Sequence, residues 1–108
     1  MEAKLSVLIP VRNEARNVGR CLEALRGWAD EIVVVDSDSN DGTQEIARSH
    51  AANVVQFHYA GGWPKKRQWA LDTYAWRNPW ILLLDADEIM TAEVRRAISE
   101  ARLMRQTK

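Results

Sequence analysis

Short strand-like segments alternate with longer amphipathic segments along the chain, and this alternation constrains the fold more than any other feature. The strand-like segments cover residues 5–9, 31–35, 53–57 and 80–84. Between and after them, apolar residues recur at helical spacing, as at Val18, Cys21, Leu22 and Leu25. Strands joined by helical crossovers form a parallel sheet with helices on both faces. We therefore expect an α/β fold with a mainly parallel sheet of four strands.

Breaker and capping residues set the expected ends of these elements. Pro10 should end the first strand, because proline cannot donate a hydrogen bond to a ladder. Asn13 and Asp41 are candidate N-caps of the first two helices, and Thr91 is a candidate N-cap of the last. Gly27 is a candidate stop for the first helix. The fourth strand is a continuous apolar run, so we expect it to be fully buried.

Length and composition narrow the class of protein. The 108 residues suffice for one domain, so we expect a single domain over 1–108. Fifteen basic and fifteen acidic side chains cancel, which argues against a nucleic-acid-binding protein. A single cysteine excludes an internal disulfide and favours reducing, cytoplasmic surroundings. No apolar run approaches the ~20 residues of a membrane span, and no signal peptide is recognisable, although peripheral association of a longer parent protein with the inner membrane stays open.

Polar residues gather where the predicted strands end, and ligands of open α/β sheets bind beyond the carboxyl ends of the strands. These residues are Arg12, Asn13 and Glu14 after the first strand, Asp36 and Asp38 after the second, and Asp85, Asp87 and Glu88 after the fourth. A basic cluster, Lys65-Lys66-Arg67, follows a glycine-rich loop. An acidic edge facing a basic cluster suits a metal-bound phosphate ester, because carboxylates hold a hard cation and cationic side chains neutralise phosphate oxygens.

The Asp85-Ala86-Asp87 segment has a geometry of its own. It follows the fourth apolar run directly, so the first carboxylate lies at the strand tip and the second roughly 6–7 Å further along an extended chain. Mg²⁺ and Mn²⁺ usually take one or two carboxylates and complete their shell with substrate phosphates and water. The segment thus predicts a divalent metal site, whereas the ordinary alternative for Asp87 is an acid at a helix entry.

Taken together, four ordered motifs resemble those of family 2 glycosyltransferases, which have the GT-A fold. They are Pro-Val-Arg-Asn-Glu (10–14), Asp-Ser-Asp-Ser-Asn-Asp-Gly-Thr (36–43), Lys-Arg-Gln-Trp-Ala-Leu (66–71) and Asp-Ala-Asp-Glu (85–88). The likeness is to the lipopolysaccharide-core β-glucosyltransferase-like branch and covers residue 5 to about residue 101. It implies a Rossmann-like GT-A sheet, truncated to the amino-terminal half that binds the nucleotide-sugar. In such enzymes a second half binds the acceptor and supplies the catalytic base, so no residue here is assigned as that base.

The resemblance also implies roles for individual residues. The donor-binding residues would be Pro10, Val11, Arg12, Asn13, Glu14, Asp36, Asp38, Arg67, Asp85 and Ala86, and the metal ligands Asp87 and Asp85. Asp36 would hydrogen-bond the uracil of a UDP-sugar, and Arg67 would lie beside the base or the diphosphate. Asp85 would contact the ribose or a metal-bound water. Without the family, Asp36 would be ordinary turn chemistry and Arg67 part of a solvated helix start.

The implied activity is inverting transfer from a UDP-sugar, with UDP-glucose expected, to a glycan or lipid-linked acceptor of the cell envelope such as lipopolysaccharide core. Bound Mg²⁺ or Mn²⁺ would neutralise charge on the β-phosphate while a carboxylate base deprotonates the attacking hydroxyl. One alternative is an isolated nucleotide-binding fragment that turns nothing over. A weaker one is a Mg²⁺-dependent phosphohydrolase of the haloacid-dehalogenase type, whose Asp-x-Asp normally lies on the first strand.

Two further expectations concern cysteine and tryptophan. Cys21 falls on the apolar face of the first helix and should pack in the core. Trp63 and Trp69 flank the basic cluster, where they could stack on sugar or contact a membrane. They could instead form exposed apolar surface through which the chain dimerises.

Overall fold

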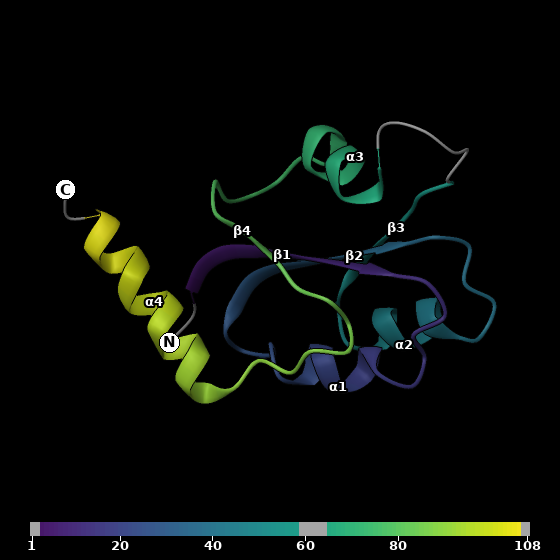
Figure 1. Cartoon of the computed structure of the whole chain (residues 1–108), viewed down its shortest axis with the longest axis horizontal. Coiled ribbons are helices and arrows are strands. Elements are labelled where there is room, and N and C mark those ends of the chain that lie inside the picture. Colours follow the sequence, from purple (N-terminus) through teal and green to yellow (C-terminus); the bar gives the residue numbers. More distant parts are fainter. Residues whose placement is uncertain (1–2, 59–64, 107–108) are drawn as a thin grey trace.

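The computed structural model describes residues 3–58 and 65–106, and side chains within 4–58 and 65–100. The elements are β1 (Ala3–Val11), α1 (Val18–Glu23), β2 (Ala29–Asp36), α2 (Thr43–Ser49), β3 (Asn53–Gln56), α3 (Lys66–Thr73), β4 (Ile81–Leu83) and α4 (Ala92–Gln106). The described strands form one parallel sheet in the order β3-β2-β1-β4. Helices α1 and α2 cover one face and α3 covers the other (Figure 1). The predicted α/β fold is confirmed.

The apolar core lies on both faces of the sheet, because successive side chains of a strand point to opposite faces. Val7 and Ile9 of β1 pack toward α1, whereas Leu8 packs on the other side with Val33 and Phe57. A strand buried on both faces reads as a continuous apolar run, which is the pattern of the β1 and β2 segments. The predicted strands at these positions are therefore correct, and each is longer than predicted.

Pro10 was predicted to end the first strand, but it lies within β1. Even-numbered residues of β1 turn their backbone groups toward β4: Ser6 N donates to Trp80 O, and Leu8 O accepts from Leu84 N. The register with β4 stops at Leu8. The missing N–H of Pro10 thus faces a side on which β4 no longer pairs, and proline is tolerated there.

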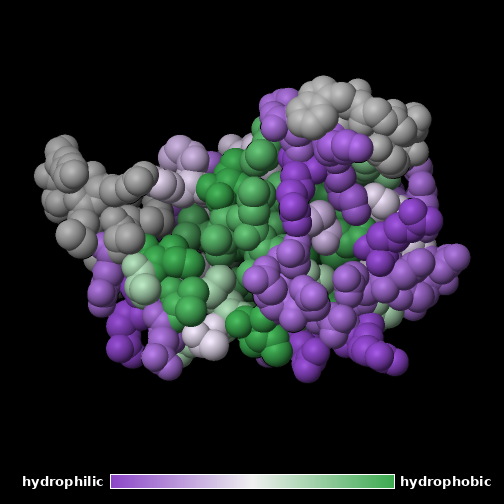
Figure 2. All heavy atoms as spheres, viewed as in Figure 1, coloured by the Kyte–Doolittle hydropathy of each residue, from purple (hydrophilic) through white to green (hydrophobic). Residues whose placement is uncertain are grey.

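Strand β4 is not fully buried, contrary to the prediction. It pairs with β1 and lies at an edge of the sheet. Leu83 is 47 % exposed, and Ile81 and Leu82 are half-buried. Figure 2 shows hydrophobic side chains gathered on the face that β4 crosses, and Ile89 and Val94 are further large exposed apolar residues. An apolar run indicates a strand, but its burial depends on which strands and helices come to lie beside it.

The predicted helix boundaries have mixed outcomes. Asn17 takes the N-cap position of α1, and Asn13 lies in the preceding loop with a left-handed φ of 53°. Gly42, with a left-handed φ of 92°, takes the N-cap position of α2 in place of the predicted Asp41, whose Oδ1 accepts the N–H of Thr43 at 3.1 Å. At α4, the hydroxyl of Thr91 accepts the N–H three residues further along the chain at 3.2 Å, as its predicted capping role requires.

Helix α4 lies at one side of the sheet, beyond the amino-terminal ends of the strands (Figure 1). The indole N–H of Trp28 donates to the hydroxyl of Ser99 at 3.1 Å, and Ile98 packs against the core on the α1 side. These contacts hold α4 against the connection between α1 and β2. Within the residues that the structure describes, no helix combines the length and the apolar character needed to cross a membrane.

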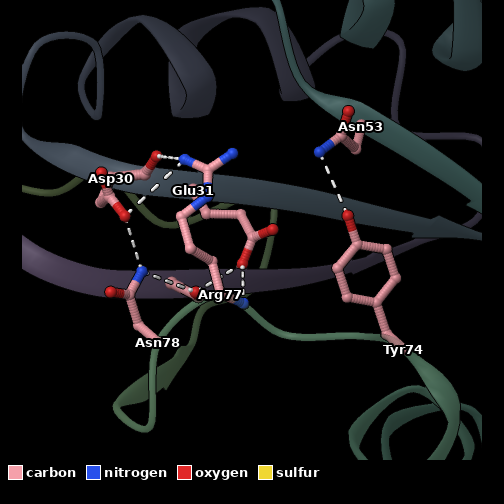
Figure 3. Close-up of polar contacts among 7 residues, drawn as sticks. Asp30, Glu31, Asn53, Tyr74, Arg77 and Asn78 are labelled. Atoms are coloured by element: carbon pink, nitrogen blue, oxygen red, sulfur yellow. Dashed lines mark hydrogen bonds and ion pairs between the residues drawn. The ribbon is translucent and has the colours of Figure 1, made fainter.

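A partly buried group of hydrogen-bonding residues, here called the polar clamp, joins β1 and β2 to the connection before β4 (Figure 3). Glu31 Oε1 accepts from Ser6 Oγ at 2.7 Å and from Arg77 N at 3.0 Å. The amide of Asn78 donates to Ser6 Oγ at 3.2 Å and to Asp30 Oδ2 at 2.8 Å. Ser6 and Glu31 are buried, so these bonds satisfy polar groups that would otherwise be costly. The clamp fixes where β4 begins.

Replacing Asn78 with alanine should lower the free energy of unfolding by about 1–3 kcal/mol, because it removes two donors from a largely buried network. Urea denaturation followed by tryptophan fluorescence measures this loss. Asn53→Ala is the control, since the Asn53 amide donates to the Tyr74 hydroxyl at an exposed position (Figure 3). The control should shift stability by less than about 0.5 kcal/mol. Equal losses in the two variants would contradict a stabilising role for the polar clamp.

Cys21 is fully buried on α1, which confirms its predicted place in the core. Burial, followed by the negative charges of Glu88 and Asp87, raises the pKa of the thiol from 9.0 to about 11.

We therefore expect alkylation at pH 8 to be at least about a hundredfold slower in the folded chain than in denaturant, because the thiolate is the reactive form. Mass spectrometry of a maleimide time course measures both rates. Comparable rates would show that Cys21 is accessible and ionised.

Candidate functional site

The carboxyl ends of the parallel strands bring the predicted residues to one edge of the sheet. Val11 at the end of β1 lies in register with Asp36 at the end of β2. The Asp85 segment follows β4 on the other side of β1, and the start of α3 reaches the same edge through Lys66. These residues were predicted to lie at one edge of the sheet, and the strand order brings the segments that carry them to that edge.

Two loops at this edge, residues 12–17 and 37–43, are hydrogen-bonded into one unit that we call the loop platform. Asn13 N donates to Ser39 Oγ at 2.7 Å, and Asn13 Oδ1 accepts from Asn40 N at 2.9 Å. Asn13 and Asp38 both have left-handed φ angles, 53° and 49°, a conformation that asparagine and aspartate tolerate better than most residues. The short polar residues of the two motifs thus form the turns themselves.

A second pair of contacts closes the loop platform near α2. Glu14 N donates to Thr43 Oγ1 at 2.9 Å, and Ala15 N donates to Asp41 Oδ2 at 3.1 Å. The hydrogen bond from the Thr43 side chain is the main reason that the pKa of Asp41 is lowered. Asp41 therefore joins the two loops in addition to serving the start of α2, a role that the sequence analysis did not predict. The Ser-Asn-Asp-Gly-Thr run was the available signal.

Asp36 is buried, and its carboxylate is occupied by the chain itself. Oδ1 accepts from Ser39 Oγ at 2.5 Å, while Oδ2 accepts from Ser39 N at 3.0 Å and from the Gln44 amide at 2.7 Å. Burial raises the pKa of Asp36, but hydrogen bonds from Gln44, Ser39 and Gln56 outweigh it, so the pKa is lowered. These are the contacts expected of a residue that stabilises a turn, and a hydrogen bond between Asp36 and uracil stays a prediction.

The exposed members of the predicted set lie around this platform. Arg12 and Asp38 are exposed, and Asp38 Oδ1 lies 3.0 Å from Nδ1 of His58, a residue beyond the end of β3. Pro10 is half-buried, and Val11 is buried at the end of β1. Among the predicted residues on this side of the edge, the exposed side chains are those of Arg12, Asn13 and Asp38.

On the other side of β1, Asp85 and Arg67 form an ion pair in which Nη2 lies 2.5 Å from Oδ1. Both side chains are about half exposed. The chain turns here instead of continuing as an extended strand: Glu88 N donates to Asp85 O at 3.0 Å, and Glu88 Oε1 accepts from Asp85 N at 2.9 Å. The predicted extended spacing of Asp85 and Asp87 is therefore wrong. A carboxylate three residues on stabilises a turn that the Asp-x-Asp pattern alone does not reveal.

Asp87 is the predicted metal ligand that the described residues leave most accessible. Its side chain is exposed and takes part in none of the hydrogen bonds or ion pairs found among them, whereas Ala86 beside it is buried. Across those same residues, no three Asp, Glu, His or Cys side chains converge into a metal site. One free carboxylate beside a second fits Mg²⁺ or Mn²⁺, which draw remaining ligands from phosphate and water. The donor set is compatible with the predicted cation.

Lys66 belongs to this edge more closely than the sequence analysis recognised. Its side chain is half-buried, and Nζ donates to Val11 O at 2.8 Å. Burial lowers its pKa, Asp36 acts in the opposite direction, and the charges of Arg12 and Arg67 lower it further. The sequence signal was its place at the start of a helix after a breaker-rich loop, but the basic cluster did not distinguish it from its neighbours.

The tryptophan predictions near the basic cluster have separate outcomes. Trp69 is half-buried, with its ring centroid 5.1 Å from that of Phe57 on the inner side of α3. It is therefore not the exposed apolar surface that was predicted, because the β3 end supplies an aromatic partner. Trp63 lies outside the described residues.

Comparison with known proteins places these observations in a family. The sequence model of Glycosyl transferase family 2 matches residues 6–101. The chain is 37 % identical over 92 residues to an uncharacterized glycosyltransferase of Rickettsia bellii, covering 85 % of this chain and 30 % of that protein. It is 36 % identical over 100 residues to the lipopolysaccharide core biosynthesis glycosyltransferase LpsC of Rhizobium meliloti, covering 89 % and 36 %. The chain thus spans about a third of these relatives.

Solved structures agree on the fold. A mannosyltransferase of Pyrobaculum calidifontis, in complex with GDP-Man and Mn²⁺, superposes with a TM-score of 0.67 at 23 % identity, covering 94 % of this chain and 32 % of that one. Glucosyl-3-phosphoglycerate synthase of Mycobacterium tuberculosis, in complex with UDP, gives 0.64 at 25 %, covering 81 % and 35 %. The arrangement is the Rossmann-like α/β sheet of GT-A enzymes. The chain belongs to glycosyl transferase family 2.

Proposed function

We propose that this chain is the donor-binding part of a glycosyltransferase and that it binds a UDP-sugar, with UDP-glucose as the expected donor, together with Mg²⁺ or Mn²⁺. The observation that carries the proposal is the exposed carboxylate of Asp87, which has no hydrogen-bond or ion-pair partner among the described residues, beside the Arg67–Asp85 pair. Carboxylates for a cation and a guanidinium for phosphate oxygens are what a metal-bound diphosphate requires. Nucleotide complexes of the structural neighbours, with UDP in one and with GDP-Man and Mn²⁺ in another, support this class of ligand.

In this proposal, different parts of the donor bind on the two sides of the β1 end. Residues 10–14 and the loop platform border the base and ribose, with the Asp36 carboxylate holding the platform in shape. Arg67 and Asp85 lie on the β4 side, where the diphosphate and the cation bind. Asp87 is the principal cation ligand, with Asp85 as the second. Arg67 balances charge beside these carboxylates and donates to phosphate when it leaves Asp85.

A bound dication would supply positive charge to the diphosphate as the bond to the sugar breaks. The chain's own part is to hold the donor in one orientation between the loop platform and the Asp85–Glu88 turn. The acceptor proposed is a cell-envelope glycan such as lipopolysaccharide core, which the likeness to LpsC supports. We assign the catalytic base and acceptor site to regions of the full-length enzyme beyond these 108 residues. The second candidate function is therefore binding of the donor without turnover. It is favoured by the fact that the chain spans only about a third of the length of these relatives.

Titration of the ¹⁵N-labelled chain with UDP and Mg²⁺ tests this proposal. We expect amide shifts at residues 10–14, near Asp36 and at Arg67, and trace Mn²⁺ should broaden signals around Asp87.

Asp87→Asn should weaken metal-dependent UDP binding about tenfold or more, because it removes a ligand charge. The control is Glu45→Gln, an exposed carboxylate on α2 that should leave binding unchanged. A well-dispersed spectrum without shifts at millimolar UDP would reject donor binding by this chain.

A further inference from the structure

Strand β4 pairs with β1 on one side and has an outer side that no strand covers among the described residues. Leu84 N donates to Leu8 O at 3.0 Å, so the even-numbered residues of β4 turn their backbone groups toward β1. Alternate residues of a strand direct their N–H and C=O groups to opposite sides. The backbone groups of Ile81 and Leu83 therefore point outward, where they form a template for a further strand.

The side chains along this outer side are apolar. Residues 81–83 are Ile, Leu and Leu, with no charge that would oppose pairing with another strand. Ile81 packs against the core on the α3 side, and Leu83 shares that face because side chains alternate along a strand. Leu83 is nevertheless 47 % exposed. Outward backbone groups and exposed apolar surface thus coincide, and both favour the addition of a strand.

The stretch that can pair is limited at both ends. Pro79 precedes the strand and has no N–H to donate. Beyond the other end, Asp85 N donates to Glu88 Oε1 at 2.9 Å and Asp85 O accepts from Glu88 N at 3.0 Å. An added strand can therefore pair with residues 81–83, and the centre of that stretch is Leu82.

The two ends of β4 differ in charge. The carboxyl end leads into the turn at residues 85–88, whose three carboxylates are exposed. Before the amino end lies Arg77, whose side chain is 62 % exposed and donates to Asp30 O at 3.1 Å. A guanidinium has five N–H donors, so others remain for a further acceptor. An antiparallel strand with the same charges would bring opposite charges together.

We propose that a second copy of this chain covers the outer side of β4, with the two β4 strands antiparallel about a two-fold axis at Leu82. Ile81 of each copy then exchanges both backbone hydrogen bonds with Leu83 of the other. The same register sets Arg77 of each copy level with the acidic turn of the other. A two-fold interface uses the same surface on both copies, so assembly closes at a dimer. No nucleotide takes part, so this inference does not rest on the proposed function.

Sedimentation velocity from micromolar to millimolar chain, without nucleotide or metal, tests the proposal. We expect a monomer–dimer equilibrium with a dissociation constant in the micromolar range, because so short a pairing makes a small interface. Leu83→Lys should weaken dimerisation about tenfold or more, since a charge on an edge strand opposes pairing. The matched control is Ile89→Lys, at an apolar residue that is 52 % exposed but lies outside the strand. It should change the dissociation constant less than about threefold.

Cross-linking tests the register. A residue on the two-fold axis lies between two hydrogen-bonded pairs, so the Cα atoms of its two copies are about 4.5 Å apart, within the range for a disulfide. Leu82→Cys should therefore give a covalent dimer under mild oxidation, and Ile89→Cys should not. Cys21 is buried and should contribute no cross-link to either variant.

Other outcomes would overturn the proposal. A chain that stays monomeric at millimolar concentration would leave the outer side of β4 to the additional chain of its longer relatives. Equal weakening by Leu83→Lys and Ile89→Lys would mean general apolar association and no strand pairing. A dimer in which Leu82→Cys forms no cross-link would refute the two-fold axis at Leu82.

Discussion

The parallel pairing of β1 with β2, buried on both faces, is the constraint on which the rest of the molecule depends. Its register sets Val11 beside Asp36, so the loops that follow the two strands begin next to each other. The side chains of the two strands point alternately into the α1 side and the α3 side of the core. A slip of one residue would exchange these faces and would move the ends of the two strands out of register, so that the loops that follow them would no longer begin side by side.

The arrangement of the candidate site depends on the pairing of β1 with β2. Asn13, Ser39 and Asp41 can exchange hydrogen bonds because the two loops start at adjacent strand ends. Their left-handed turns and caps use backbone N–H groups that regular structure leaves unpaired. A loop platform of this kind presents a ligand with a preformed surface, since the chain has already lost the conformational freedom that binding would otherwise remove.

At the carboxyl ends of the strands, the fold determines where each charged side chain lies, more than its position in the sequence does. Lys66 and Arg67 are consecutive, yet one contacts the end of β1 and the other the segment after β4. The polar clamp at the opposite edge contributes to this division, because it fixes the connection through which the chain passes from α3 to β4. Because β4 is the outermost strand of the sheet, Leu83 is left exposed beside the candidate site.

The sequence alone was enough to predict the α/β class, the four strands in order, the burial of Cys21 and the family, because periodicity and motif spacing are local properties of the chain. It also indicated which loops carry the polar residues. Tertiary structure decided that Pro10 lies inside β1, that β4 lies at an edge, that the Asp36 carboxylate turns inward and that Asp85 pairs with Arg67. The Asp36 carboxylate is held mainly by near neighbours in sequence, Ser39 and Gln44. By contrast, the Arg67–Asp85 pair joins residues 18 apart in the chain, and the contact of Lys66 with Val11 joins residues 55 apart. Which of several polar side chains meet across such a separation is decided by strand register and helix placement, and no local pattern encodes that outcome.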